Sequence, residues 1–239
     1  MNNIIIPFRA NLLSVQGFTN FKSCLFDGVD DVVELGTSAD LELIDDFSVS
    51  LWIKDASALN RGVLCCSSRS AANGWQIQRT TANKISFYCA ARTAISTTLI
   101  NTDTWFNVIA TWEKNVGGGI GNRVRIYVNG TLEGTATRLS TLPPTYTGTI
   151  YKQIAFPYAG SNNFEGGIDE VAVYDRLLTP TEISEISATP IDLSDYTPLA
   201  YYRMGDNDIF PTLTDNGSGG NNGTLTNMDA ADIVNDVPA

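Results

Sequence analysis

Short stretches in which apolar and polar residues alternate recur along this chain of 239 residues. Apolar side chains take every second position in residues 47–53 and again in residues 123–128, and an Asn-Gly pair follows at 129–130. Such alternation is typical of a strand with one buried face, and Asn-Gly after it indicates a tight hairpin. Further strands are expected within 24–35 and at 63–67, 75–79, 85–90, 105–112, 131–133, 153–158, 164–174 and 199–204. Short strands at this spacing predict an all-β fold, an antiparallel two-sheet sandwich.

The alternation also predicts which side chains are buried. One face of the first stretch carries Phe47, Val49, Leu51 and Ile53, and the other carries Ser48, Ser50 and Trp52. A similar inward face is expected for Phe106, Val108, Ala110 and Trp112, and another for Val124, Ile126 and Val128. In residues 164–174 the alternation places Asp169 inward beside Val171 and Val173. A carboxylate in that position needs a partner, because an isolated buried charge is costly.

One short helix is expected after residue 179. Thr179 and Glu182 have the spacing of a capping box, and Pro180 occupies the first helical position. Leu178 and Ile183 can pack as a hydrophobic staple across the helix start. The helix is predicted to span residues 180–187.

The chain divides into three parts by composition. Residues 1–22 are predicted to form an N-terminal arm or edge strand, with Ile4–Ile6 as the strand and Pro7 as its end. Residues 23–189 hold the sandwich, and residues 190–239 hold a C-terminal strand and an acidic, loop-rich tail. The terminal segments are expected to be extended arms, and the tail adds a strand either to this sandwich or to a neighbouring chain.

Composition excludes several functions. The net charge of −11 disfavours nucleic acid and anionic membranes as partners. Without histidine, Ser-His-Asp catalysis, Cys-His catalysis and imidazole zinc sites are excluded. The four cysteines lie in strand-like runs and are expected to be reduced core residues. Residues 1–13 lack the basic region of a secretory signal, so export by a cleaved signal is not expected.

Four sequence blocks together resemble one family. They are FDGVDDVVEL at 26–35, FSVSLWIK at 47–54, the WFNVIATW to RVRIYVNGTLEG hairpin at 105–134, and FEGGIDEVAVYDRLLTPTEI at 164–183. Covering about residues 22–187, they resemble the laminin-G-like jelly roll of the concanavalin A-like lectin/glucanase superfamily. The AYYRMGDND tail is similar to segments that often precede such modules. The combination of this tail type with the missing secretory signal resembles structural proteins of tailed bacteriophages.

The resemblance implies a binding protein rather than an enzyme. Glycoside hydrolases of the superfamily carry Glu-x-Asp-x-x-Glu or Glu-x-Asp-x-Glu on one strand, and no such triplet occurs here. Glu165 and Asp169 can share a face, but Gly166-Gly167 between them indicates a turn. We therefore expect no catalytic activity.

The resemblance also implies a structural calcium ion, which would join the closing-strand Asp169 to Asp27 and Asp30 in the opening block. The alternative is that Asp169 accepts backbone N–H bonds in a turn.

For a sugar ligand, the outward aromatic and amide side chains are the candidates: Trp75, Tyr88, Tyr127 and Asn73, with Trp52 and Gln76 nearby. The alternative is that the tryptophans belong to the core.

Two functions follow from this reading. The first is a non-catalytic structural or display protein of a phage virion, a capsid decoration or fibre component made in the host cytoplasm. It would form a homo-oligomer or dock on capsid or tail proteins. The alternative is a carbohydrate-binding module that recognises a cell-surface or environmental polysaccharide.

Overall fold

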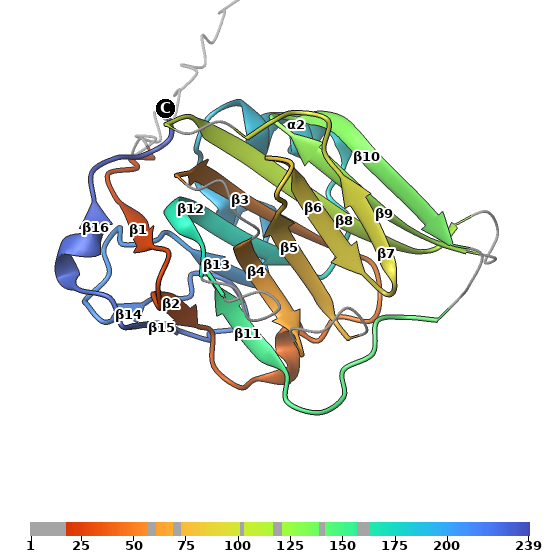
Figure 1. Ribbon diagram of the computed structural model, residues 1–239, viewed down its shortest axis with the longest axis horizontal. Coiled ribbons are helices and arrows are strands. Elements are labelled where there is room, and N and C mark those ends of the chain that lie inside the picture. Colours follow the sequence, from red (N-terminus) through yellow and green to blue (C-terminus); the bar gives the residue numbers. More distant parts are fainter. Residues whose placement is uncertain are drawn as a thin grey trace, which may run out of the picture.

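Two antiparallel sheets face one another in the computed structural model of the protein (Figure 1). The structure describes residues 18–56, 61–68, 73–100, 103–116, 121–138, 142–156 and 163–239. Within these residues each sheet has eight strands, which confirms the predicted two-sheet sandwich. The proposed N-terminal arm at 1–22 lies mostly outside the described residues, and so does the edge strand predicted at Ile4–Ile6.

The first sheet, sheet A, has the strand order β10-β9-β8-β3-β12-β1-β16, and β13 pairs with β12 off this path. Its strands are β1 (Ser23–Asp27), β3 (Phe47–Asp55), β8 (Trp105–Asn115), β9 (Gly121–Val128), β10 (Thr131–Arg138), β12 (Glu165–Tyr174), β13 (Ala200–Tyr202) and β16 (Ile233–Val234).

The second sheet, sheet B, has the order β14-β15-β2-β11-β4-β5-β6-β7. Its strands are β2 (Val32–Glu34), β4 (Arg61–Ser67), β5 (Trp75–Arg79), β6 (Ile85–Cys89), β7 (Arg92–Ile95), β11 (Tyr151–Ile154), β14 (Thr212–Leu213) and β15 (Gly223–Thr226).

The core between the sheets is built from the predicted inward faces. Phe47, Val49, Leu51 and Ile53 are each 0% exposed, and the predicted apolar faces of β8 and β9 join the same cluster. Phe47 packs against Trp75 of sheet B with ring centroids 5.7 Å apart. Burying one such side chain stabilises the fold by about 1.5–3 kcal/mol. The four cysteines are buried and form no disulfide within the described residues. Cys24, Cys66 and Cys89 lie in the core, as predicted, whereas Cys65 lies outside the core cluster.

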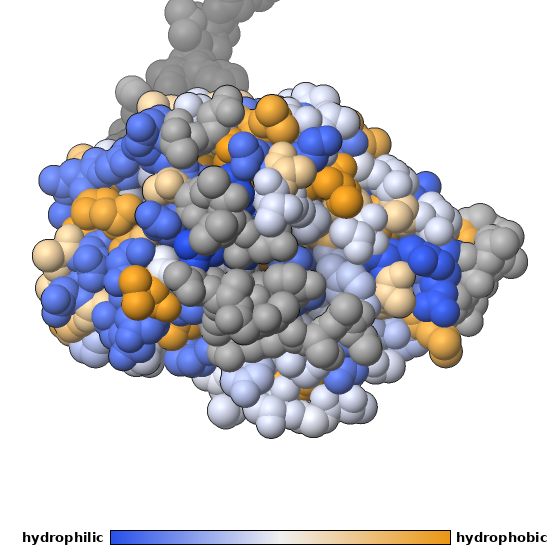
Figure 2. All heavy atoms as spheres, viewed as in Figure 1, coloured by the Kyte–Doolittle hydropathy of each residue, from blue (hydrophilic) through white to orange (hydrophobic). Residues whose placement is uncertain are grey.

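A second, smaller apolar cluster covers the outer face of sheet A. Helix α2 (Pro180–Ala188) begins with the predicted capping box, in which Thr179 and Glu182 bond to each other's backbone N–H. Leu178 and Ile183 pack in this cluster with Ile109 of β8 and Tyr174 of β12. Three 3₁₀ helices complete the described helical structure: η1 (Ala39–Leu41), η2 (Leu193–Tyr196) and η3 (Ala230–Asp232). In the described part of the chain, no helix has the length and apolarity to span a membrane. On the face of the molecule that Figure 2 shows, hydrophilic and hydrophobic residues are interspersed among the described residues.

The C-terminal segment belongs to this sandwich. β13 pairs with β12, β15 pairs with β2, and β16 pairs with β1. In Figure 1, β14 and β15 accordingly lie beside β2, and β16 lies beside β1. Of the two alternatives for the tail, the structure therefore shows strand addition within the same chain.

One end of the sandwich is where the site lies, and we call it the loop rim. It is the end where β1 and β3 finish and where β12 and β8 begin. Register places Asp27 opposite Glu165, Asp55 opposite Gly166, and Lys54 opposite Trp105. The turn from β1 to β2 lies at the same end, so this turn meets the first residues of β12.

Candidate functional site

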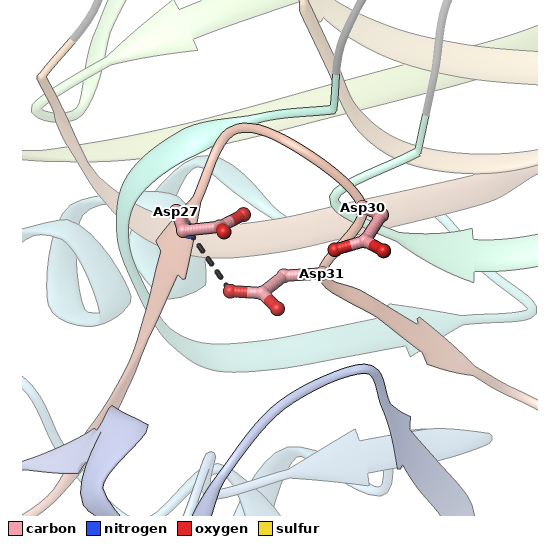
Figure 3. Close-up of side chains that lie close together, drawn as sticks. All are labelled: Asp27, Asp30 and Asp31. Atoms are coloured by element: carbon pink, nitrogen blue, oxygen red, sulfur yellow. Dashed lines mark hydrogen bonds between the residues drawn. The ribbon is translucent and has the colours of Figure 1, made fainter.

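The turn between β1 and β2 brings three carboxylates together (Figure 3). Asp27 ends β1, while Asp30 and Asp31 lie just before β2. Their ligand-type oxygens all lie within 4.8 Å of one another. Asp27 and Asp30 were predicted as metal ligands and are brought together, whereas Asp31 was missed although it follows directly in the sequence.

Backbone contacts hold this turn in shape. Asp27 Oδ1 accepts a hydrogen bond from the Val29 N–H at 2.7 Å, and Asp31 Oδ2 accepts one from the Asp27 N–H at 2.9 Å. Gly28 has φ +78°, and a Cβ there would lie 2.7 Å from the Cβ of Glu165. Only glycine therefore allows the turn to approach β12 this closely.

Two asparagines fasten the same turn from neighbouring segments. Asn163 donates to the carbonyl of Asp31 at 2.8 Å, and Asn227 donates to the carbonyl of Asp30 at 3.1 Å. A buried arginine, Arg61, donates to the carbonyl of Gly28 at 3.1 Å. These three bonds to backbone carbonyls hold the carboxylates near one another in addition to the bonds that Asp27 and Asp31 accept themselves.

The electrostatics of the turn favour a cation. Burial raises the pKa of Asp31 to about 6, and the nearby charges of Asp27, Asp232 and Asp30 act in the same direction. A bound divalent cation would relieve this repulsion, and carboxylate oxygens are the ligands that calcium prefers. Asp27, Asp30 and Asp31 therefore fit a calcium ion by their chemistry.

Asp169 does not join this turn, contrary to the sequence prediction. In β12 it pairs with Trp52, whereas the residue of β12 opposite Asp27 is Glu165. Four residues along a strand correspond to roughly 13 Å. The same separation keeps Glu165 and Asp169 from acting as a pair of catalytic carboxylates, which need to be about 5–9.5 Å apart.

A β-bulge explains why the predicted face of Asp169 was wrong. The pairing register of β12 shifts between Asp169 and Ala172, and Glu170 takes a left-handed φ of 48°. Because of this extra residue, Asp169 shares a face with Trp52 rather than with Val171. It is still fully buried, and Asn20 donates to its Oδ2 at 2.7 Å while the Glu170 N–H donates to its Oδ1 at 2.8 Å. Asp169 therefore accepts one backbone N–H bond, as the alternative to a calcium ligand expects, but at a strand bulge rather than in a turn.

Glu170 forms a second buried group that the sequence did not reveal. Its carboxylate is 1% exposed, accepts a hydrogen bond from the Tyr201 hydroxyl, and lies 3.6 Å from Arg203 Nε. Burial raises the pKa of Glu170 to about 7, although Tyr201 and Arg203 act against this shift. Burial, followed by repulsion from Glu170, also raises the pKa of Asp169 well above its usual value.

The predicted sugar-binding residues do not form one site. Trp75 was expected on an outward face but is 0% exposed, and its indole N–H donates to the Leu41 carbonyl at 3.1 Å. It is a core residue, so it cannot stack on a sugar. Asn73 is tied to another loop, because its side-chain amide donates to the Thr147 carbonyl at 3.0 Å.

The two tyrosines lie on different sheets. Tyr127 is half-buried on β9 and packs against the small cluster under helix α2. Tyr88 is half-buried on β6 of sheet B, where its hydroxyl accepts a hydrogen bond from the Ala91 N–H at 3.1 Å. Only Tyr88 therefore has predominantly polar cross-strand neighbours.

A row of mostly polar side chains crosses sheet B at the level of Tyr88. Cross-strand register joins Glu34, Gln153, Cys65, Gln76, Tyr88 and Thr93 in that order. Their strand neighbours Val33, Ile77 and Phe87 point into the core, so the row lies on the outer face. The central members are buried, whereas Glu34 and Tyr88 are half-buried and Thr93 is exposed. Single strands could not predict this row, because it depends on the register of six of them.

The family model described as the concanavalin A-like lectin/glucanases superfamily, Laminin_G_3, matches residues 27–184. The chain belongs to this family. Comparison with curated proteins yields no match.

Solved structures similar to this concanavalin A-like chain include a protein of Bacteroides ovatus provisionally described as carbohydrate-binding. The two are 17% identical with a TM-score of 0.69, and the match covers 92% of this chain and 62% of that one. A CBM40 module of a Ruminococcus gnavus sialidase, bound to α2,3-sialyllactose, is 12% identical with a TM-score of 0.57, covering 70% of this chain and 96% of that module. A pentraxin of Limulus polyphemus is 14% identical with a TM-score of 0.50, and the match covers 72% of this chain and 84% of the pentraxin chain. At such low identity these similarities show the fold alone.

Proposed function

We propose that this protein binds carbohydrate without cleaving it. The observation that carries the proposal is the similarity over 92% of the chain to the Bacteroides protein, whose description names carbohydrate binding. The similarity to a sialidase module bound to sialyllactose points the same way. The absence of the superfamily's catalytic triplet from the sequence supports binding rather than hydrolysis.

The mostly polar row on sheet B supplies suitable chemistry for this function. The exposed hydroxyl of Thr93, beside Tyr88, can hydrogen-bond sugar hydroxyls, and so can the half-buried carboxylate of Glu34 at the other end of the row. Tyr88 offers a partly exposed ring that can stack on a sugar face. We place the glycan contact at the Tyr88 end of the row, where the side chains are most accessible.

We also infer that calcium binds at Asp27, Asp30 and Asp31. The ion would fix the turn between β1 and β2 at the loop rim. The convergence of the three carboxylates supports this proposal, since hard oxygen ligands in one small space suit calcium.

The test is a glycan array with the purified full chain, with and without calcium, followed by titration of the best ligand. Tyr88→Ala is expected to weaken binding about tenfold or more, because the stacking surface is lost. Tyr88→Phe keeps the ring and serves as the matched control, with a loss expected to stay under threefold. A chain that binds no glycan on the array, while giving a cooperative unfolding transition, would refute the proposal.

The virion role inferred from the sequence stays a prediction. Detection of the protein on purified phage particles would support it, and such display is compatible with glycan binding.

A further inference from the structure

A second surface of the protein has the form of a ligand groove, on the outer face of sheet A at the loop rim. One hollow of about 240 Å³ is lined by residues that include Asp27, Glu165 and Asp232. A neighbouring hollow of about 120 Å³ is lined by residues that include Lys54 and Asp103. The two hollows share Leu25, Ala56 and Gly166, so they form one groove across the start of β12. Sheet A separates this groove from the row on sheet B.

The floor of the groove consists of bare backbone. A Cβ on Gly166 would lie 2.1 Å from the Lys54 carbonyl oxygen, and its φ is +134°. A Cβ on Gly167 would lie 2.7 Å from the six-membered ring of Trp105. Glycine at 167 therefore lets the indole lie directly against the strand, and glycine at 166 lets β12 approach the backbone of β3.

Apolar surface remains accessible beside this floor. Trp52, Trp75 and Trp112 are 7% exposed or less, whereas Trp105 is only half-buried. Leu25 is 44% exposed on the neighbouring strand. An accessible indole next to an exposed aliphatic side chain provides a surface on which the apolar face of a sugar ring can pack.

The groove is strongly acidic at both ends. At one end, none of the described Lys or Arg residues forms an ion pair with Asp27 or Asp232. At the other end, Lys54 is shared between Asp103 at 3.9 Å and Asp236 at 2.9 Å. Glu165 has a longer contact with Arg61, at 3.6 Å. The lining therefore carries more negative charge than its basic neighbours neutralise.

We propose that this groove binds a glycan whose sugar units carry free amino groups. The ring faces would pack on Trp105 and Leu25, and the ammonium groups would pair with Asp232 and Glu165, which leaves Asp27 to the calcium turn. Sialic and uronic acids would be repelled by the same carboxylates. The inference rests on the proposed carbohydrate function and adds a second site with its own charge preference.

The experiment compares two ligands that differ in charge at the same positions. Glucosamine oligomers and N-acetylglucosamine oligomers of equal length are titrated into the full chain by calorimetry, in low and in moderate salt. Glucosamine oligomers are expected to bind about tenfold more tightly, and salt is expected to reduce the difference because it screens the carboxylates. A uronic acid oligomer is the anionic comparison.

Variants locate the site. Asp232→Asn with Glu165→Gln is expected to remove the preference for the amine, because both carboxylate charges are lost. Asp232→Asn keeps an amide oxygen that can accept the hydrogen bond from the Asp229 N–H. Asp195→Asn is the control, because it removes an exposed acidic charge outside this groove. Trp105→Phe is expected to weaken both ligands and to preserve their ratio.

The outcomes separate this inference from the proposed function. Equal affinity for the two oligomers, or a preference that survives in the double variant, would overturn the groove proposal. Binding of other glycans that depends on Tyr88 would then leave the proposed function standing. Absence of binding to glycans of every charge class would overturn both.

Discussion

Glu170 is a buried carboxylate whose ionisation is costly for the fold. It lies at the bulge of β12, fully buried beside Tyr201, with Arg203 as its nearest basic group. Arg203 also pairs with Asp206 at 2.9 Å, so its charge is divided. Asp169 lies next to it in the chain, and no basic group contacts Asp169 within the described residues. The folded protein therefore holds Glu170 and Asp169 where protonation is favoured.

Because these two carboxyls favour protonation when buried, we expect the free energy of unfolding to rise as the pH falls from 8 to 5. The pKa of Glu170 is raised to about 7 in the folded state, so between its usual value and 7 the folded chain binds more protons than the unfolded chain. Asp169 acts in the same direction. Glu170→Gln is expected to raise the free energy of unfolding at pH 8 by on the order of 1–3 kcal/mol and to flatten its pH dependence.

The measurement is urea denaturation of wild type and variant at pH 5, 6, 7 and 8. Asp175→Asn, at an exposed carboxylate just after β12, is the control for the change in net charge. A variant with the same pH slope as the wild type would show that Glu170 is not the responsible group.

Because Asp31 lies close to two other carboxylates, we expect calcium to stabilise the folded protein by binding at the loop rim. Millimolar calcium is expected to raise the melting temperature of the wild type and to have little effect on Asp31→Asn, which loses the most buried of the three carboxylates. Since the pKa of Asp31 is about 6, protons compete with calcium below that value, and affinity should fall about fivefold between pH 6 and pH 5.

The measurement is a thermal melt with calcium, with magnesium and with chelator. Asp195→Asn, an exposed carboxylate near helix α2, is the control. A wild type with the same melting temperature in all three conditions would contradict the calcium proposal.

Among the elements, helix α2 begins at a capping box that the sequence predicted, and its contribution to stability can be measured. Thr179→Ala removes the side chain that accepts from the Glu182 N–H, and we expect it to lower stability by about 1 kcal/mol. Thr181→Ala, two residues later at an exposed helical position, is the control and is expected to change stability by less than half as much. Equal effects in thermal and urea denaturation would show that the cap contributes nothing specific.

Strands and their faces were largely predictable from the sequence where the alternation is regular. Residues 47–53 and the β9–β10 hairpin formed as expected, because period-2 patterns and Asn129-Gly130 act locally. β12 departed from the pattern at its bulge, which has no distinct local signature. Trp75 alternates with the buried Ile77, so its burial agrees with the alternative that the tryptophans belong to the core. Cross-strand groupings such as the row on sheet B require register, which one strand does not encode.

At the scale of the whole molecule, the C-terminal segment is part of both sheets rather than a separable tail. A chain ending at residue 189 would lack β13, β14, β15 and β16, leaving buried groups such as Val33 and Val171 without their cover. We expect this truncated chain to show no cooperative unfolding transition by circular dichroism. Adding the 190–239 segment as a separate peptide is expected to restore the transition, and a cooperative transition without the peptide would contradict the prediction.

The position of β1 also orders events during synthesis. This early strand lies between β12 and β16, so its partners are made about 140 and 210 residues later. A nascent chain emerging from the ribosome therefore carries Cys24 and Phe26 exposed until the strands that cover them have been translated. Contacts this far apart in sequence form slowly. Sheet A is complete only once residue 234 has left the exit tunnel, because β16 is its last strand along the chain.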